Sequence, residues 1–380
     1  MKKVNVGLIG AGWMGTFYSQ GFLNVQRAYG TEVVPVFKAV ADPVEAAGKK
    51  VQEQFGYQDY YADWKDLLKD PEIDLVVITT PNYTHRDIVV AAAEAGKHIV
   101  CEKPMAMNVQ QAKEMADAVK KAGVLSLVDF IYRRLPISAK AKKMVDNGEL
   151  GEIFTFRGEF DCSYCADPNT PMTWRQYKDL AGTGALGDLT THIISLSDMI
   201  VGSKLGKIVE VNAVWDTVYK KRPKSASDST MVDVENEDEI YIMVKYENGR
   251  IGQMSSGRIS VGKPCEMSYE IQGSKGTIRF NLMRLNELEV ALSSDVPDDI
   301  GYKSLVGNVG HGDYFNFSQL NGLGVSYGDT MGIQAHSILK AIADNKPVEI
   351  DIQYGYEVER ICAAIEKSAK EERWVKVSEV

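Results

Sequence analysis

The stretch Val-Asn-Val-Gly-Leu-Ile-Gly-Ala-Gly-Trp-Met-Gly, residues 4–15, decides the expected fold of the first third of the chain. Its apolar part, Val4–Ile9, is typical of a buried strand, and Gly10–Gly15 matches the pattern G-x-G-x-x-G. A strand, this pattern and a following helix together form a turn that binds a dinucleotide. The first glycine makes the tight turn, the second admits the pyrophosphate, and the third lets the helix pack closely on the strand. The alternative is a turn that is merely rich in glycine.

An acidic residue is expected at the end of the second strand, where it would hydrogen-bond the adenosine ribose. Asp42 occupies this place, 27 residues after Gly15. A carboxylate there accepts a hydrogen bond from the 2′-hydroxyl of NAD and repels the 2′-phosphate of NADP, so NAD is the expected cofactor. The alternative is an acid that only begins the helix before Pro43. Nearby lysines keep NADP use possible: Lys38, Lys49 and Lys50.

Strands and helices alternate through the first third of the chain. Further strands are expected at 33–41, 75–79, 98–101 and 124–130, and helices at 43–55, 84–95 and 109–122. In the last helix, apolar residues recur at helical spacing: Ala112, Met115, Ala116 and Val119. This alternation with apolar strands predicts a parallel, doubly wound Rossmann sheet with helices on both faces.

After about Arg133 the pattern changes to consecutive strands. They are expected at 153–160, 208–217, 239–246, 252–256, 268–272, 276–280 and 287–291, with helices over 184–200, 330–343 and 354–372. Asn248-Gly249 and residues 274–276 mark hairpin turns, and the polar stretch 220–228 is expected to be a surface loop. The fold class is therefore α/β: a Rossmann domain over 1–132, then an α+β domain with a largely antiparallel open sheet over 133–380. The last helices of the second domain can pack back on the first.

The composition excludes several classes of protein. The 380 residues carry 43 Lys plus Arg against 52 Asp plus Glu, a net charge of −9, which argues against a nucleic-acid-binding surface. No apolar run approaches about 18 residues, so no membrane span is expected and the cytoplasm is the expected location. Five cysteines are an odd count, unlike a secreted disulfide framework. Cys162 and Cys165 form a lone C-x-x-C, either a redox pair, half of a zinc site, or simply two reduced thiols near a strand end; the last is favoured, and no metal is expected.

Two further segments carry the residue types of an active site. Cys101-Glu102-Lys103-Pro104 follows the fourth expected strand, and residues 184–192 read Gly-Ala-Leu-Gly-Asp-Leu-Thr-Thr-His. Lys103 would project from the carboxyl end of a parallel strand, where such sheets bind their ligands. Asp188 and His192 are four residues apart on an expected helix, so their side chains share one face. Taken singly, each residue has an ordinary structural explanation: a surface lysine, an acid on a helix face or a packed histidine.

With these residues in view, the chain resembles the Gfo/Idh/MocA family of NAD(P)-dependent oxidoreductases. The segments that carry the resemblance span the whole chain: Gly10–Gly15, Ala41-Asp42, Thr80-Pro81-Asn82 with His85, Glu102-Lys103-Pro104, 130–136, 184–192, 234–257 and 271–280. The resemblance implies a catalytic set of Lys103, Asp188 and His192. It also implies cofactor contacts from Gly10, Gly12, Trp13, Met14, Gly15, Asp42, Thr80, Pro81, Asn82, His85, Glu102 and Lys103.

Chemistry supports the implied catalytic set. An alcohol can be oxidised only if its hydroxyl proton is removed as hydride leaves the carbon, and histidine has a suitable pKa to accept that proton near neutrality. Lys103 would stabilise the developing alkoxide, and Asp188 would orient the hydroxyl. Expected substrate contacts resemble the branch of the family that acts on cyclic sugars and anhydrosugars such as levoglucosan: Lys103, Arg133, Asn169, Trp174, Arg175, Asp188, Thr191 and His192. For Trp174 and Arg175, a core ring with a solvated guanidinium is a serious alternative.

The expected function is oxidation of a secondary hydroxyl of a cyclic sugar, anhydrosugar or inositol with NAD. One alternative is an NAD-dependent glycosidase that oxidises its substrate transiently; another is a non-catalytic regulator that senses NAD(P). The intact Lys103, Asp188 and His192 argue against the regulator, and the Lys-Pro pair argues against the glycosidase. The family resemblance implies a homodimer or homotetramer that associates through the exposed face of the C-terminal sheet.

Overall fold

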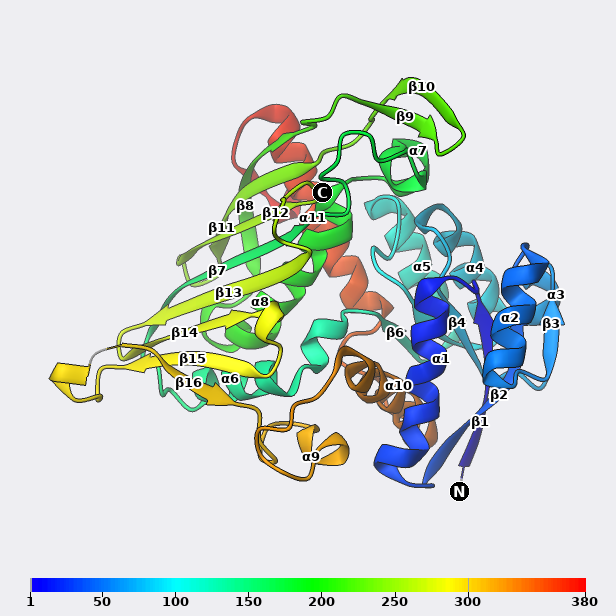
Figure 1. Ribbon diagram of the computed structural model, residues 1–380, viewed down its shortest axis with the longest axis horizontal. Helices are drawn as coiled ribbons and strands as arrows, with labels where there is room; N and C mark the ends of the chain where they lie inside the picture. The colour runs from blue at the N-terminus through cyan, green and yellow to red at the C-terminus, as the bar shows by residue number, and fades with distance from the viewer. Residues whose placement is uncertain (1, 300) are drawn as a thin grey trace. The chain divides into compact units, whose positions relative to one another are not determined.

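The computed structural model describes residues 2–299 and 301–380 (Figure 1). The chain folds into two compact units that interleave along the sequence. The first contains the residues up to Arg134 and the later segment Ser326–Glu359. The second contains Leu135–Val325 and Arg360–Val380.

The first unit contains a six-stranded parallel sheet in the order β3-β2-β1-β4-β5-β6. This order defines the doubly wound Rossmann arrangement, so the predicted fold of this part is confirmed. All four residues of β4 are buried, as expected for a strand covered on both faces. The strands are β1 Lys2–Ile9, β2 Val33–Ala41, β3 Asp59–Tyr61, β4 Leu75–Ile78, β5 His98–Cys101 and β6 Ser126–Val128.

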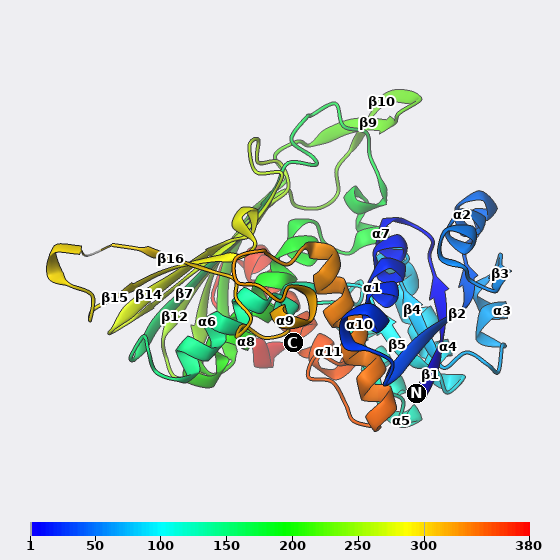
Figure 2. The ribbon, with the colours of Figure 1, turned by 60° about the horizontal axis from the view of Figure 1, so that its bottom comes forward.

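The first unit contains the first part of α11 Ile352–Glu371 and these helices: α1 Trp13–Tyr29, α2 Glu45–Phe55, α3 Trp64–Leu68, α4 Asn82–Glu94, α5 Val109–Ala122 and α10 Tyr327–Asp344. Helices α1 and α10 lie side by side, although about 300 residues separate them (Figures 1 and 2). Their backbones approach so closely that a Cβ at Gly21 would lie 2.8 Å from the carbonyl oxygen of Met331. Phe22 and Val25 of α1 are buried. The partner of the first helix thus comes from the last sixth of the chain.

The second unit contains a nine-stranded sheet in the order β16-β15-β14-β13-β7-β12-β11-β8-β17. All neighbouring strands are antiparallel except β7 and β12, and both predicted hairpin turns join antiparallel neighbours. The strands are β7 Ile153–Cys162, β8 Ile208–Asp216, β11 Glu239–Tyr246, β12 Ile251–Gly257, β13 Cys265–Gly273, β14 Gly276–Asn281, β15 Glu287–Leu292, β16 Lys303–Val306 and β17 Val375–Lys376. The prediction of a largely antiparallel sheet is confirmed.

Helices cover one face of this sheet and leave the other open (Figure 2). Helix α8 contacts β7, and α6 contacts both α8 and β15. Along β7, Phe156 and Phe160 are buried, whereas Arg157 is exposed on the opposite face. The helices of this unit are α6 Pro136–Asp146, α7 Lys178–Ala181, α8 Thr191–Leu205, α9 Tyr314–Phe317 and the second part of α11 Ile352–Glu371.

One prediction is wrong: residues 220–228 do not form a surface loop. They contain β9 Lys221–Ser225, which pairs with β10 Asp228–Asp233 in a two-stranded antiparallel ribbon. Arg222 is fully buried there, and its guanidinium donates to the carbonyl oxygens of Cys165 and Asp167. These acceptors lie more than 50 residues away, so local polarity could not reveal them.

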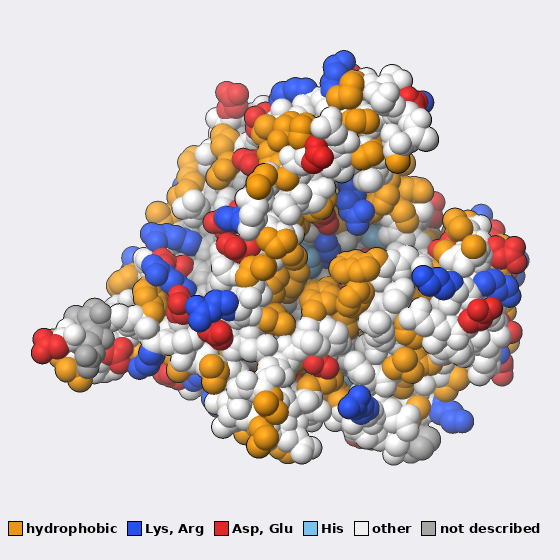
Figure 3. Space-filling view, in the orientation of Figure 1, with side chains coloured by type: hydrophobic (Ala, Val, Ile, Leu, Met, Phe, Trp, Pro, Cys, Tyr) orange, Lys and Arg blue, Asp and Glu red, His pale blue; other side chains and the backbone are white. Residues whose placement is uncertain are grey.

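Acidic and basic side chains intermingle on the face shown in Figure 3. The net charge of −9 is therefore not concentrated in one patch on that face. Among residues 2–299 and 301–380, no helix is long and apolar enough to cross a membrane.

Candidate active site and cofactor-binding turn

The glycine-rich turn lies between the ends of β1 and β4, where the order of the sheet reverses. Gly10 has φ 99°, a left-handed conformation that favours glycine. A Cβ at Gly15 would lie 2.2 Å from the carbonyl oxygen of Gly10, closer than any real contact. By contrast, a Cβ at Gly12 would meet no atom within 4 Å. Gly10 and Gly15 are therefore required by the fold, whereas Gly12 leaves open space above the turn.

The start of α1 fits a phosphate group. Gly12 is the N-cap of this helix, no side chain caps it, and its first turn holds no acidic residue. The first N–H groups of a helix have no partner within the helix and carry the positive end of the helix dipole. A dinucleotide pyrophosphate is the kind of anion that this arrangement binds. Trp13, the next residue, is 66% exposed and packs edge-on against Phe17.

Asp42 stands at the end of β2, beside the glycine-rich turn. Its Oδ2 accepts a hydrogen bond from Ala11 N at 2.7 Å, and its Oδ1 accepts one from Val44 N at 2.8 Å. The first bond ties the carboxylate to the turn, and the second is the helix-start interaction considered as the alternative. Each carboxylate oxygen keeps a second lone pair, so these bonds leave capacity for a ribose hydroxyl.

His85 connects two segments that were predicted to contact the cofactor. Its Nε2 lies 2.8 Å from the carbonyl oxygen of Thr80, and its Nδ1 lies 3.1 Å from that of Pro104. The ring is completely buried, and burial lowers its pKa. These contacts favour a supporting role, in which His85 fixes the Thr80–Asn82 segment against the loop that carries Lys103. Asn82 is also buried, at the start of α4.

Lys103 follows β5, as predicted, and buried carboxyl groups accept hydrogen bonds from the backbone of its loop. Glu102 is buried and accepts a hydrogen bond from the backbone N–H of Lys103 at 3.1 Å. Burial, together with the nearby charge of Asp129, raises the pKa of Glu102 and favours its neutral form. Glu359 accepts from Met105 N at 3.1 Å on the other side of Pro104. The position of the Lys103 backbone thus depends on buried carboxyl groups.

Arg133, which is expected at the substrate pocket, makes structural contacts within the first unit. Its guanidinium is buried, forms an ion pair with Glu349 and donates to Tyr354 Oη at 2.9 Å. It also lies over the Tyr354 ring, 5.0 Å from the centroid. These partners belong to the same unit, so Arg133 secures the later segment Ser326–Glu359 to that unit.

In the second unit, Asp188 lies on a π-helical turn, Leu186–Thr190, that leads directly into α8. A helix was predicted here, but not its wider first turn; π turns occur frequently at functional sites. Asp188 Oδ2 accepts a hydrogen bond from Tyr164 Oη at 2.7 Å and lies 3.9 Å from Arg175 Nε. The carboxylate is thus held by two side chains from the segment between β7 and α7.

His192 and Thr191 form the first turn of α8 and are both buried. The His192 ring packs against Phe160, with 5.8 Å between the ring centroids. Thr191 Oγ1 donates to the carbonyl oxygen of Gly187 at 3.0 Å, which places its hydroxyl within the helix. Thr191 therefore supports the turn that carries Asp188.

The other expected substrate residues lie on the segment between β7 and α7. Trp174 is half-buried, and the guanidinium of exposed Arg175 lies over its ring, 4.4 Å from the centroid. Asn169 is exposed, and its amide donates to Asp167 Oδ1 at 3.1 Å. The guanidinium of buried Arg222 donates hydrogen bonds to backbone carbonyl oxygens of this segment and so holds it in place. His311 lies elsewhere in this unit, where its Nδ1 accepts a hydrogen bond from Asn308 N in a local turn.

Two contributors were missed in the sequence. Tyr164 was not considered, although its hydroxyl contacts Asp188; nothing in the sequence links the two. Glu237 accepts hydrogen bonds from the backbone at the start of the Asp188 segment. A signal for such a residue did exist, because residues 184–187 supply no side chain that could cap a helix.

Taken with the doubly wound sheet, the geometry of the turn defines an NAD-binding Rossmann-fold oxidoreductase. Residues 4–130 match the oxidoreductase family with an NAD-binding Rossmann fold, and residues 138–279 match the GFO/IDH/MocA C-terminal domain. The chain therefore belongs to the Gfo/Idh/MocA family, as the resemblance implied.

Individual relatives match over the full length. A levoglucosan dehydrogenase of Pseudarthrobacter phenanthrenivorans is 36% identical, with 100% of each chain covered. A myo-inositol 2-dehydrogenase of Thermotoga maritima is 26% identical, with 99% of each covered. A solved structure of a levoglucosan dehydrogenase in complex with NADH and levoglucosan superimposes with a TM-score of 0.94 at 38% identity, covering 99% of this chain and 100% of that one.

Proposed function

We propose that this protein oxidises a secondary hydroxyl group of a cyclic sugar, anhydrosugar or inositol, with NAD as the acceptor. The observation that carries the proposal is the full-length similarity to levoglucosan dehydrogenase, at 36% identity, in a chain that retains Lys103, Asp188 and His192. Inositol dehydrogenase is among the relatives, which supports the wider class of ring polyols.

Bound NAD supplies the carbon that accepts the hydride. The protein supplies acid–base groups and positioning. His192 accepts the hydroxyl proton at an imidazole nitrogen, and the Lys103 ammonium stabilises the negative charge that develops on the same oxygen. Asp188, held by Tyr164 and Arg175, orients the hydroxyl as a hydrogen-bond acceptor. Binding of the ring is assigned to Asn169, Trp174 and Arg175, with the Trp174 ring stacking on a sugar face.

Cofactor binding is assigned to the first unit. Gly10, Gly12 and Gly15 hold the pyrophosphate at the start of α1, and Asp42 binds the ribose and makes NAD preferred over NADP. Trp13, Met14, Thr80, Pro81, Asn82, Glu102 and Lys103 line the rest of the cofactor path. We assign cofactor binding to the unit formed by Met1–Arg134 and Ser326–Glu359, and substrate binding and oligomerisation to the unit formed by Leu135–Val325 and Arg360–Val380. The five cysteines, all present as thiols, and the use of NAD suit a cytoplasmic enzyme.

Activity and binding measurements on the purified protein distinguish the proposed dehydrogenase from two rival functions. Purified protein is supplied with NAD and a panel of anhydrosugars, hexoses and inositols, and NADH absorbance at 340 nm is followed. A dehydrogenase produces NADH in proportion to substrate oxidised. An NAD-dependent glycosidase cleaves an aryl glycoside without net NADH, and a regulator binds NAD(H) without turnover. Preferred oxidation of lactate or malate over every ring polyol contradicts the proposal.

The catalytic assignment has its own test. Lys103→Met and His192→Asn should each lower kcat by about 10²-fold, the effect of losing a positioned acid–base or electrostatic group. NADH binding, measured by quenching of protein fluorescence, should stay within about threefold, because the glycine-rich turn and Asp42 are intact. If both variants keep wild-type turnover, the active site lies elsewhere.

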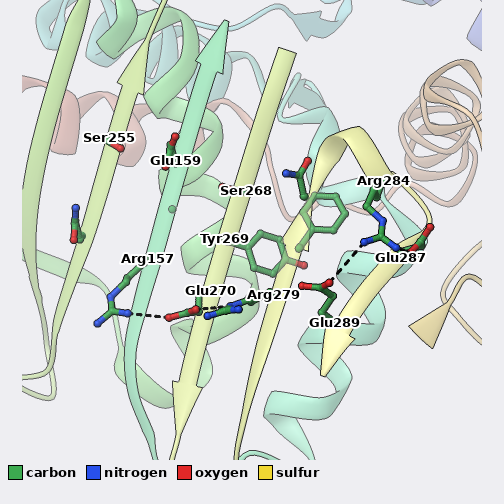
Figure 4. Close-up of a pocket in the computed structure, with 14 residues that line it drawn as sticks. Arg157, Glu159, Ser255, Ser268, Tyr269, Glu270, Arg279, Arg284, Glu287 and Glu289 are labelled. Atoms are coloured by element: carbon green, nitrogen blue, oxygen red, sulfur yellow. Dashed lines mark hydrogen bonds and ion pairs between the residues drawn. The ribbon is translucent and has the colours of Figure 1, made fainter. Parts of the chain in front are cut away.

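The open face of the second sheet is the proposed surface of self-association. A cavity of about 540 Å³ lies on it, lined by residues of β7, β12, β13, β14 and β15 (Figure 4). Charges of both signs alternate across it: Arg157 and Arg279 both bind Glu270, at 2.8 and 2.6 Å. Such a pattern can be self-complementary about a twofold axis. Ser268→Trp, which places a large ring on this face, should shift the mass measured by light scattering after gel filtration toward the monomer; an unchanged oligomer contradicts the proposed surface.

A further inference from the structure

The segment that carries Asp188 begins without a capping side chain of its own. Ala185 is the N-cap of the π-helical turn, and it offers no hydrogen-bonding side chain. The first N–H groups of a helix need acceptors, particularly where the helix start is buried, as it is here. The acceptors must therefore come from elsewhere in the fold.

Glu237 provides them, from the connection between β10 and β11. Its Oε1 accepts hydrogen bonds from Gly184 N at 2.8 Å and from Leu186 N at 2.9 Å. The N–H between them, on Ala185, donates to the backbone carbonyl oxygen of Glu237 at 3.2 Å. One residue thus accepts from three consecutive N–H groups, and it is only 4% exposed.

The backbone of Gly184 also lies very close to the backbone of Glu237. A Cβ at Gly184 would lie 2.0 Å from the Glu237 carbonyl oxygen, so only glycine permits this contact. The two backbones are therefore in contact at the residue where the π-helical segment starts. A shift of Glu237 would move the start of that segment with it.

The sequence neighbours of Glu237 hold the backbone of Arg175, whose side chain lies beside the Asp188 carboxylate. Asn236 Nδ2 donates to the carbonyl oxygen of Arg175 at 2.8 Å. Arg258, which is 1% exposed, donates to Asn236 Oδ1 at 2.8 Å and to Asp238 Oδ1 at 2.9 Å. Three consecutive side chains, 236–238, are thus locked in place, and between them they hold the backbone of Arg175 and the start of the Asp188 turn.

We infer that Glu237 is a positioning residue of the reaction: its carboxylate caps the π-helical turn from a distant part of the chain and so sets the place of Asp188. This inference rests on the proposed function, because it assumes that Asp188 orients the substrate. It assigns Glu237 no contact with substrate or cofactor. Binding energy and geometry at the reacting centre are sensitive to shifts of about 1 Å, which can cost about 10²-fold in rate.

The test compares Glu237→Leu with Glu237→Gln. Both hydrogen bonds end on one oxygen, so an amide oxygen can accept them, whereas leucine cannot. Glu237→Leu should lower kcat by about 10- to 100-fold with NADH binding unchanged, and Glu237→Gln should recover most of the rate. Glu235→Leu is the matched control: Glu235 accepts from Lys178 N at 2.8 Å, at the start of α7, and its loss should leave kcat unchanged.

A double-mutant cycle separates positioning from general stability. In an Asp188→Ala background, which removes the acceptor, Glu237→Leu should cost less than about threefold, because residues that act through one another are not additive. Full additivity, or wild-type kcat in Glu237→Leu, overturns the inference. If Glu237→Leu does not fold, Glu237→Asp, which withdraws the oxygen by about one C–C bond of 1.5 Å, takes its place in the cycle. Wild-type turnover in Asp188→Ala alone would instead refute the proposed function.

Discussion

Replacing Gly15 or Gly12 by alanine should have different effects: the change at Gly15 should destabilise the fold, and the change at Gly12 should weaken NADH binding. At Gly15 the new Cβ would lie 2.2 Å from the Gly10 carbonyl oxygen, about 1.2 Å inside ordinary contact at 3.4 Å. Because backbone lies on both sides, α1 must shift, and overpacking of this kind costs about 2 kcal/mol. For a unit of this size that lowers Tm by about 4 to 8 °C. At Gly12 nothing lies within 4 Å and φ is −78°, which any residue adopts.

Gly12→Ala should therefore fold about as well as the wild type, because a gain of about 0.4 to 1 kcal/mol from a less flexible unfolded chain is offset by the poorer N-cap that alanine makes. Its methyl group nevertheless occupies the space through which a pyrophosphate approaches the backbone, so the Kd for NADH should rise at least tenfold. Differential scanning fluorimetry without ligand measures the first effect, and calorimetric titration with NADH measures the second. Gly12→Ala with a wild-type Kd would refute the placement of the cofactor at this turn. A wild-type Tm for Gly15→Ala would refute the packing argument.

Three other expectations concern single side chains. Asp42→Ser should narrow the preference for NAD over NADP in kcat/KM, and a wild type that already uses NADP equally well contradicts the assignment of Asp42. Burial raises the pKa of Glu359 to about 7, above its usual 4.5. The free energy of unfolding should therefore fall by about 3 kcal/mol as the pH rises from 4.5 through 7, and the Tm of Glu359→Gln should fall less than that of the wild type between pH 5 and 8. Cys162 and Cys265 are opposite each other on β7 and β13, at a spacing that a disulfide can bridge. Treatment with glutathione disulfide should therefore join them and lower the count of protein thiols from five to three, with two molecules of glutathione released. An unchanged thiol count, or a loss of two thiols in Cys265→Ser as well, contradicts this pairing.

The parts of the fold that were predictable are those with a local signal. The strand His98–Cys101 and the helix Val109–Ala122 occur at the predicted residues, because an apolar run and a helical repeat each mark their element. The short strand Asp59–Tyr61 has neither, and it was missed. The polar stretch 220–228 predicts a loop although it contains β9, because the one buried side chain of β9, Arg222, finds its acceptors in a distant segment.

The candidate site shows the same division. The glycine-rich turn could be predicted from the motif, because Gly10 and Gly15 meet local steric demands that the motif records, whereas Gly12 leaves open space. The surroundings of Asp188 could not, because Tyr164 and Glu237 reach it from other parts of the chain. For Arg133, the family position was visible, but its partners Glu349 and Tyr354, which lie more than 200 residues away in the sequence, were not. Local chemistry thus yields candidate groups for the reaction, and tertiary contacts decide how their side chains are held.

The pairing of α1 with α10 has a consequence for the growing polypeptide. Helix α1 ends at Tyr29 and α10 ends at Asp344, so the ribosome adds 315 residues (344 − 29) between them. At about 5 to 20 residues per second, α1 waits roughly 15 to 60 s for its neighbour. During that interval the surface around Gly21 that α10 will cover remains accessible to chaperones and to other nascent chains. The unit that contains the Rossmann sheet can therefore be completed only after residues Leu135–Val325 of the other unit have been made.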